Sequence, residues 1–188
     1  MTGNIYEVQI HTRFASKQKA LITLARAEDM RTGWFFDWPG IWQITSFDCQ
    51  NFIKLVYNEQ VWGIARYGLY PFPGKPRFLH IHELESNPAS RDMQANRLVE
   101  PIGKWLIWYA VKIGLQYCSE TLKEEPLITL ESLEAAIGYY RDIIEMQYLG
   151  PTSIAPGKDG YAFRFSKSQA EGFCKRQEAQ WGVPTLVR

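Results

Sequence analysis

Two histidines and two glutamates lie close together in a short extended segment, where they could bind a metal ion or move protons. In a strand, one face carries His80, His82 and Leu84, and the other carries Ile81, Glu83 and Glu85. Neighbours on one face could share a metal, but His11 is the only other histidine in the chain. We therefore expect no metal centre and interpret the pair as ordinary strand histidines.

Three cysteines are widely spaced, at Cys49, Cys118 and Cys174, with no CxxC pair. An odd number of distant cysteines favours reduced thiols over a disulfide framework, and it indicates a reducing cytoplasm. Neither Cys118 nor Cys174 has an adjacent histidine motif, so a cysteine nucleophile is not expected.

Five aromatic residues are interleaved with Pro39 and Gly40 in one passage: Trp34, Phe35, Phe36, Trp38 and Trp42. No single period holds there, which indicates a loop with short elements. These rings could line an apolar or aromatic acceptor pocket, or they could belong to the core.

The composition is that of a folded globular protein of 188 residues, with 46% hydrophobic and 22% charged residues. A net charge of +1 disfavours nonspecific binding to nucleic acid. The start of the chain lacks the apolar run of a signal peptide. The most apolar window, Trp105 to Val111, is far shorter than the roughly 20 residues of a membrane span. We expect a soluble cytoplasmic protein with no membrane partner.

The elements that must position these residues alternate between helical and extended patterns. We expect a helix from Ser16 to about Met30 and a hairpin over residues 51–69. A strand follows over residues 77–85, then a polar stretch from Ser86 to Leu98 and a helix that begins at Pro101 and ends near Gly114.

The last third of the chain predicts a β-α unit and a hairpin. A strand at residues 126–130 precedes a helix capped by Ser132, whose apolar stripe includes Tyr140 and Ile144. Strands near residues 146–149 and 161–165 flank a Pro/Gly loop over residues 150–160, and a final helix spans residues 167–181.

This order gives a mixed α/β fold and resembles the GNAT family of acyl-CoA-dependent N-acyltransferases. The resemblance covers roughly residues 50–165 and rests on LHIHELESNPASRDMQANRLVEPIGKWLIWYAVKIG and ITLESLEAAIGYYRDIIEM. It implies a GNAT-like mixed sheet with antiparallel N-terminal strands and a central parallel pair. These two strands end near Glu85 and Glu131 and splay apart to open a cleft. We expect a single domain with a helical and aromatic region (1–50), a core (51–166) and a C-terminal helix and tail (167–188).

The family's pyrophosphate loop, Gln/Arg-x-x-Gly-x-Gly/Ala, corresponds here to residues 98–103, and only Gly103 matches it. Free amides at a helix start can still hold phosphate, although Pro101 removes one donor and Glu100 adds a negative charge. Arg97 and Lys104 could offset that charge. The resemblance implies acetyl-CoA as acyl donor, with these cofactor-binding residues: Leu84, Glu85, Arg97, Val99, Ile102, Gly103 and Lys104.

The segment Ala136 to Arg141 resembles the family's Ala-x-x-Phe-Tyr helix, with Tyr140 in the place of the catalytic tyrosine. The resemblance implies that its phenol protonates the departing thiolate; the alternative is a core tyrosine. Glu83 and Glu85 are the candidate bases for the attacking amine, directly or through water, and the alternative is a solvent-facing charge. Glu83 is favoured because it lies deeper in the strand.

Two functions follow from this pattern. The first is an acyl-CoA-dependent N-acetyltransferase that modifies an amine on a small molecule or a protein; the second is a GNAT-fold binding or interaction module with weakened or lost catalysis. Retention of Tyr140 and the two strand carboxylates favours the enzyme, and the altered glycine loop favours the module. A homodimer is compatible with both.

Overall fold

The computed structural model describes residues 3–90, 97–155 and 158–187. Its helices are α1 (Trp38–Ile44), α2 (Ile102–Tyr117) and α3 (Lys167–Trp181), with short helical turns η1 (Ala27–Asp29), η2 (Pro88–Ser90), η3 (Glu134–Ala136) and η4 (Tyr139–Ile143). The strands are β1 (Ile5–Thr12), β2 (Ala15–Leu24), β3 (Gln50–Tyr57), β4 (Gln60–Tyr70), β5 (Phe78–Ser86), β6 (Val99–Glu100), β7 (Pro126–Ser132), β8 (Gln147–Ala155), β9 (Lys158–Ser166) and β10 (Thr185–Val187).

The strands of the described residues form one ten-stranded sheet in the order β10-β1-β2-β3-β4-β5-β7-β9-β8, with β6 paired to β1. The pair β5 and β7 is parallel, with Leu79 opposite Ile128 and Ile81 opposite Leu130. This pair confirms the predicted parallel strands, and the 16-residue helix α2 lies between them in the chain. The fold is the expected mixed α/β class.

The chain divides into two compact units, each built from separate segments. Unit 1 contains residues 1–66, 83–109 and 177–188, and unit 2 contains residues 67–82 and 110–176. The strands β4 and β5 and the helices α2 and α3 each contribute residues to both units. The single domain expected from the sequence stays a prediction.

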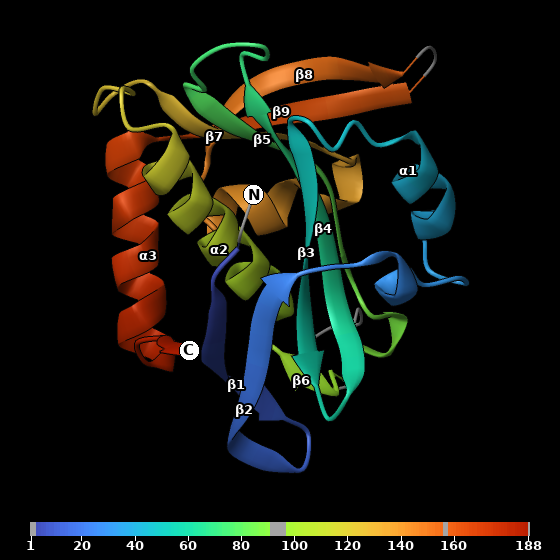
Figure 1. The fold of residues 1–188 in the computed structure, drawn as a ribbon. Coiled ribbons are helices and arrows are strands. Elements are labelled where there is room, and N and C mark those ends of the chain that lie inside the picture. Colours follow the sequence, from blue (N-terminus) through green and yellow to red (C-terminus); the bar gives the residue numbers. More distant parts are fainter. Residues whose placement is uncertain (1–2, 91–96, 156–157, 188) are drawn as a thin grey trace. The chain divides into compact units, whose positions relative to one another are not determined.

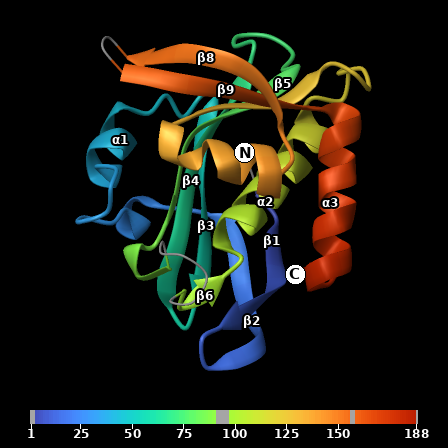
Figure 2. The ribbon, with the colours of Figure 1, turned by 180° about the vertical axis from the view of Figure 1, so that it is seen from behind.

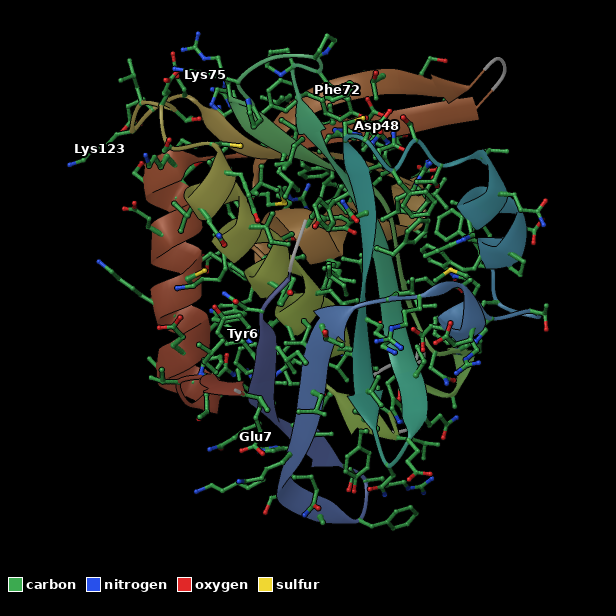
Figure 3. The ribbon with its side chains drawn as sticks, in the orientation of Figure 1. Tyr6, Glu7, Asp48, Phe72, Lys75 and Lys123 are labelled. Atoms are coloured by element: carbon green, nitrogen blue, oxygen red, sulfur yellow. The ribbon has the colours of Figure 1, made fainter. Side chains whose placement is uncertain are left out.

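In unit 1, the strands β1, β2, β3 and β4 lie side by side (Figure 1). Tyr6 of β1, labelled in Figure 3, packs edge-on against Trp108 of α2, with 5.1 Å between ring centroids, and against Tyr109. The indole of Trp105 donates a 2.7 Å hydrogen bond to the Gln9 carbonyl. These contacts hold the apolar first half of α2 against β1. The sequence patterns did not predict this packing.

The predicted hairpin over residues 51–69 is confirmed as β3 and β4. Its two-residue turn contains Asn58 and Glu59, whose φ angles are 48° and 60°. Two successive positive φ angles match the right-handed twist of the adjoining strands, so they set the register of a tight hairpin.

The helix predicted from Ser16 to Met30 is wrong, because this segment forms β2 and the short turn η1. Ala20 and Ile22 are buried at 2% and 0% exposure, while Leu21 between them is 41% exposed. This alternation of two fits a strand paired on both sides, to β1 and to β3, and the pairing overrides the helical spacing of the apolar residues.

Helix α2 begins beside Gly63 of β4, where there is no room for a side chain. A Cβ built at Gly63 would overlap Ile102 Cγ2 and would lie 3.0 Å from Leu106 Cδ1. We expect Gly63→Ala to lower the free energy of unfolding by about 1–3 kcal/mol through overpacking. The matched control is Gly172→Ala within α3, where the new methyl meets only Arg176 Nη1 at 3.6 Å. The control should raise stability by up to about 1 kcal/mol. Equal effects in denaturant unfolding would contradict this packing.

In unit 2, β7 pairs antiparallel with β9, and β9 with β8. Figure 2 shows β8 and β9 side by side from behind. The predicted closing hairpin is confirmed, but the predicted loop over residues 150–160 is wrong. Thr152 and Ser153 pair with Gly160 and Asp159, and only residues 156–157 of that loop lie outside the described residues. Pro151 fits because β8 is an edge strand, where a missing N–H breaks no ladder.

All three cysteines are free and buried. Burial raises the pKa of the Cys118 thiol to about 11, which keeps this group protonated and poorly nucleophilic. No helix among the described residues is long and apolar enough to cross a bilayer. The final helix predicted over residues 167–181 is confirmed as α3, and that predicted from Pro101 as α2.

Candidate functional site

The last residues of β5 carry the two predicted base candidates, both in unit 1. Glu83 forms a two-pronged ion pair with Arg66 of β4: Nε lies 2.7 Å from Oε2, and Nη2 lies 2.8 Å from Oε1. Arg66 Nη1 also donates to Thr45 Oγ1 and Gln50 Oε1. Each Glu83 oxygen accepts one of these bonds, which leaves a second lone-pair direction on each oxygen for a proton or a water.

Glu85 is 5% exposed, and its carboxylate accepts three hydrogen bonds from the aromatic passage. The backbone amides of Phe35 and Phe36 donate at 2.6 Å and 3.1 Å, and the Trp38 indole donates at 2.8 Å. A buried carboxylate with three donors is well compensated. This geometry favours a positioning role, and the base role of Glu85 stays a prediction.

The aromatic passage that donates these bonds to Glu85 belongs mainly to the hydrophobic core. Trp38 is fully buried and clusters with Phe52, Val61 and Ile64. Trp34 and Trp42 pack half-buried against this cluster, whereas Phe35 is 62% exposed. Asp37 caps α1 by accepting from the Gly40 amide, which explains why a helix starts between tryptophans.

The predicted phosphate loop consists of β6 and the first turn of α2, also in unit 1. The Val99 amide donates to Ser90 Oγ at 2.9 Å, so this amide is already used, and Pro101 has no N–H. The first-turn amides of Ile102, Gly103 and Lys104 have no partner within the helix. Arg97 Nη1 lies 3.9 Å from the Glu100 carboxylate, which offsets part of the negative charge there.

The start of α2 and the end of β5 meet at Gly63. A Cβ built at this glycine would overlap Ile102 Cγ2 and would lie 3.5 Å from the Glu85 carbonyl oxygen. Within unit 1 the structure therefore brings Glu85 of the predicted strand end close to Ile102 of the predicted helix start.

Tyr140 lies in unit 2, on the π-helical turn η4. The helix predicted after Ser132 is confirmed as an irregular helical segment over residues 134–143, which includes η3 and η4 with Gly138 just before η4. The predicted cap is wrong, because Ser132 ends β7 and the residue before η3 is Leu133, which makes no side-chain cap hydrogen bond. Leu133, which the sequence pattern also places on the apolar stripe of this helix, is 43% exposed, so the buried stripe does not include it. Gly138 weakens a helix at its midpoint, and single π turns occur frequently at functional sites.

The Tyr140 ring is 8% exposed and packs against Phe163 of β9, with 5.7 Å between centroids. Its hydroxyl forms no hydrogen bond with any described residue, but it is not one of their fully buried side-chain atoms without a partner, which are Ser132 Oγ, Gln177 Nε2 and Trp181 Nε1. Burial raises the pKa of the phenol to about 12, so it stays protonated at neutral pH. The arrangement therefore provides a neutral hydroxyl whose proton is not used by the fold.

The two strand histidines lie in unit 2 and are bonded to neighbouring side chains. His82 Nε2 lies 2.9 Å from the Tyr70 hydroxyl, and His80 Nδ1 lies 2.9 Å from Thr129 Oγ1. Among the described residues, no group of three His, Cys, Asp or Glu side chains could hold a metal ion.

The sequence did not identify several partners that define this site. The sequence pattern placed Arg66 in a strand but gave it no partner. A charged residue inside the apolar run VWGIARYGL is nevertheless a signal for a buried ion pair, here with Glu83. Ser90 and the Trp38 indole gave no such signal, because their roles depend on segments that the fold brings together.

No family model and no curated protein matches the chain in sequence. Solved structures match its fold. The chain aligns over 96% of its length with 99% of a Bacillus halodurans protein, at 12% identity and TM-score 0.61. It aligns over 81% with 98% of the aminoglycoside acetyltransferase AAC(6′)-Ib, solved with coenzyme A and kanamycin, at 12% identity and TM-score 0.56.

A third match is a Desulfovibrio desulfuricans protein assigned to the GNAT acetyltransferase family, at 12% identity and TM-score 0.52, with 79% of this chain and 99% of that one aligned. At such identities the likeness concerns the fold. The chain has a GNAT-like fold, as its resemblance in residues 50–165 predicts.

Proposed function

We propose that this protein is an acyl-CoA-dependent N-acetyltransferase that transfers an acetyl group from acetyl-CoA to an amine. The observation that carries the proposal is Tyr140, a buried neutral phenol on a π turn whose hydroxyl has no partner among the described residues. A core tyrosine ordinarily satisfies its hydroxyl. The GNAT-like fold, with a neighbour solved in complex with coenzyme A, supports the same reaction class.

We assign the acyl donor to the start of α2. The amides of Ile102, Gly103 and Lys104, with the positive end of the helix dipole, would hold the pyrophosphate. Lys104 and Arg97 would add positive charge, and the strand end at Leu84 and Glu85 would hold the acyl arm of the donor. Val99 would contribute packing, since Ser90 already occupies its amide.

In the reaction, the amine nitrogen attacks the thioester carbonyl carbon, a C–N bond forms, and the C–S bond breaks with its electron pair on sulfur. Glu83, acting through water at its second lone-pair directions, would take the amine proton. Tyr140 would donate its phenolic hydrogen to the departing sulfur. Glu85 would keep the aromatic passage in place.

The acceptor we propose is a small-molecule or protein amine. AAC(6′)-Ib was solved with kanamycin, an amine-bearing small molecule. The half-buried Trp34 and exposed Phe35, fixed beside the Glu83 and Glu85 strand by the Glu85 carboxylate, would supply an aromatic wall for such an acceptor.

Acetyl-CoA should raise the melting temperature of the protein, because a ligand that binds only the native state stabilises it by mass action. At a concentration of 100 times the Kd the gain is about 2.7 kcal/mol. Differential scanning fluorimetry with acetyl-CoA, and with AMP as a control that lacks the pantetheine arm, measures this. An unchanged melting temperature at millimolar acetyl-CoA would overturn the donor site.

A binding module that has lost catalysis is the second candidate. It is favoured by Pro101, by Glu100, and by the Val99 amide already bonded to Ser90, all of which weaken a phosphate site. The two candidates differ in one measurement: a transferase releases free CoA thiol when acetyl-CoA and an amine such as kanamycin are both present. A module shows the thermal shift without thiol release.

A further inference from the structure

Arg66 and Glu83 form an ion pair that is mostly enclosed by unit 1 and still partly open to solvent. They lie on the neighbouring strands β4 and β5, and both belong to unit 1. The Arg66 side chain is 12% exposed and that of Glu83 is 17% exposed. Water or a small ligand can therefore reach this carboxylate, whereas Glu85, two residues further on, is 5% exposed and accepts three hydrogen bonds.

The two parallel bonds from the guanidinium fix the plane of the Glu83 carboxylate. Arg66 Nε lies 2.7 Å from one oxygen, and Nη2 lies 2.8 Å from the other. A fork of two N–H groups holds both oxygens at once, whereas the single ammonium of a lysine is a point charge without such a fork. The pair therefore determines where a water or an amine N–H must lie to reach the remaining lone pairs of Glu83.

The guanidinium is itself held in place by two neutral acceptors. Arg66 Nη1 donates to Thr45 Oγ1 at 3.4 Å and to Gln50 Oε1 at 3.3 Å. Thr45 directly follows α1, and Gln50 begins β3. Among the described residues, Glu83 is the only ion-pair partner of Arg66. Three segments of unit 1 thus set the orientation of one carboxylate.

Stability alone does not account for this pair. An enclosed ion pair contributes little to stability compared with packed apolar residues of similar volume. Ile64, two residues before Arg66 on the same face of β4, is fully buried in the cluster around Trp38. The apolar cover therefore extends to the position next to the pair, where the chain carries two charges and two polar anchors instead.

We propose that Arg66 is a positioning residue, which holds the Glu83 carboxylate in the orientation that accepts the amine proton. The inference rests on the proposed acetyltransferase function. As the C–N bond forms, positive charge develops on nitrogen and makes its N–H acidic, so an ion-paired carboxylate suffices as the acceptor. The proton passes through a water to a Glu83 oxygen. Arg66 keeps all its protons and acts only through Glu83.

The first test is Arg66→Lys, which keeps the positive charge and removes the fork. The assay combines acetyl-CoA with a panel of kanamycin, spermidine and phenethylamine. We expect kcat to fall about 10- to 100-fold, because a misplaced group loses about that much rate. The KM of either substrate should change less than about threefold, since Arg66 acts through Glu83. Gln50→Met keeps the ion pair and removes one anchor, so kcat should fall about 2- to 5-fold.

A double-mutant cycle separates action through Glu83 from a general effect on the fold. Glu83→Gln should lower kcat about 100-fold by removing the proton acceptor. In that background Arg66→Lys should lower kcat less than about twofold, because no carboxylate remains to be oriented. Steady-state release of CoA thiol measures all four proteins. If Arg66→Lys does not fold, Gln50→Met takes its place in the same cycle.

The matched control is Lys54→Met, which breaks an ion pair of similar burial in unit 1. Lys54 Nζ lies 2.6 Å from both Asp29 oxygens, and the two side chains are 17% and 9% exposed. Loss of the lysine leaves Asp29 without its counter-charge, so the melting temperature should fall at least as far as in Arg66→Lys. The kcat of Lys54→Met should equal that of the wild type.

Four outcomes overturn the inference alone. Arg66→Lys could keep wild-type kcat, or its loss could be as large in the Glu83→Gln background as in the wild type. Glu83→Gln could keep wild-type turnover, or Lys54→Met could lose as much kcat as Arg66→Lys. A wild type that releases no CoA thiol with any amine of the panel overturns both the inference and the proposed function.

Discussion

Tyr140→Phe is expected to lower turnover about 10- to 1,000-fold and to leave the melting temperature nearly unchanged. The substitution keeps the ring that packs on Phe163 and removes only a hydroxyl that has no hydrogen-bond partner among the described residues. Its stability cost should therefore be small. The rate falls because the departing thiolate loses its proton donor, which contributes typically about 10²–10⁴-fold in such reactions. Steady-state release of CoA thiol measures the change.

The matched control is Tyr148→Phe, because Tyr148 of β8 packs on the same ring, with 5.4 Å between centroids, and is 41% exposed. This control should retain wild-type turnover. The affinity for CoA should change little in either variant. If Tyr140→Phe instead loses stability and keeps its transfer rate, then Tyr140 is a structural tyrosine and its catalytic role is wrong.

The sequence predicted the elements whose local signals agree with their neighbours. The turn at Asn58 and Glu59, the proline before α2 and the buried run of β7 each define an element by short-range chemistry. The order of these elements led to the parallel β5–β7 pair and to the GNAT-like sheet.

The failures lie where distant segments decide the structure. The residues of β2 have a helical spacing of apolar residues, but pairing to β1 and β3 on both sides forces a strand. The short strand β10 pairs with β1 although about 170 residues separate them, and no local pattern marks such a contact. At Ser132 a capping pattern and a strand end compete, and pairing with Tyr161 of β9 favours the strand.

In the candidate site, too, local signals could be predicted and contacts between distant segments could not. The residue types at Glu83, Glu85 and Tyr140 could be selected from the sequence, because their spacing on a strand and on a helical segment is local information. Their partners could not be selected, since Arg66 and the Phe35 amide are 17 and 50 residues away along the chain. These partners show how the two carboxylates differ. Glu83 keeps a second lone-pair direction on each oxygen, whereas Glu85 accepts three hydrogen bonds that hold the aromatic passage in place.

Glu85→Gln should therefore act chiefly on the structure of the aromatic passage. The amide keeps one oxygen acceptor and replaces the other oxygen with an NH₂ group. Either the Phe35 amide, which bonds one oxygen, or the Phe36 amide and the Trp38 indole, which bond the other, then face a donor in place of an acceptor. We expect the free energy of unfolding to fall by about 2–4 kcal/mol, because charge-assisted bonds to a buried carboxylate are lost. Glu171→Gln on the exposed face of α3 is the control and should stay within about 0.5 kcal/mol of the wild type.

Hydrogen exchange separates positioning from catalysis at Glu85. In Glu85→Gln at least one of the Phe35 and Phe36 amides should exchange much faster than in the wild type, since they bond different carboxylate oxygens and the glutamine keeps only one oxygen. If this passage forms the acceptor wall, KM for the amine should rise more than kcat falls, because the lost order weakens acceptor binding before it affects the reacting atoms. A variant with wild-type exchange at both amides and a large loss of kcat alone would instead assign Glu85 to proton transfer, as the base expected from its place on the strand.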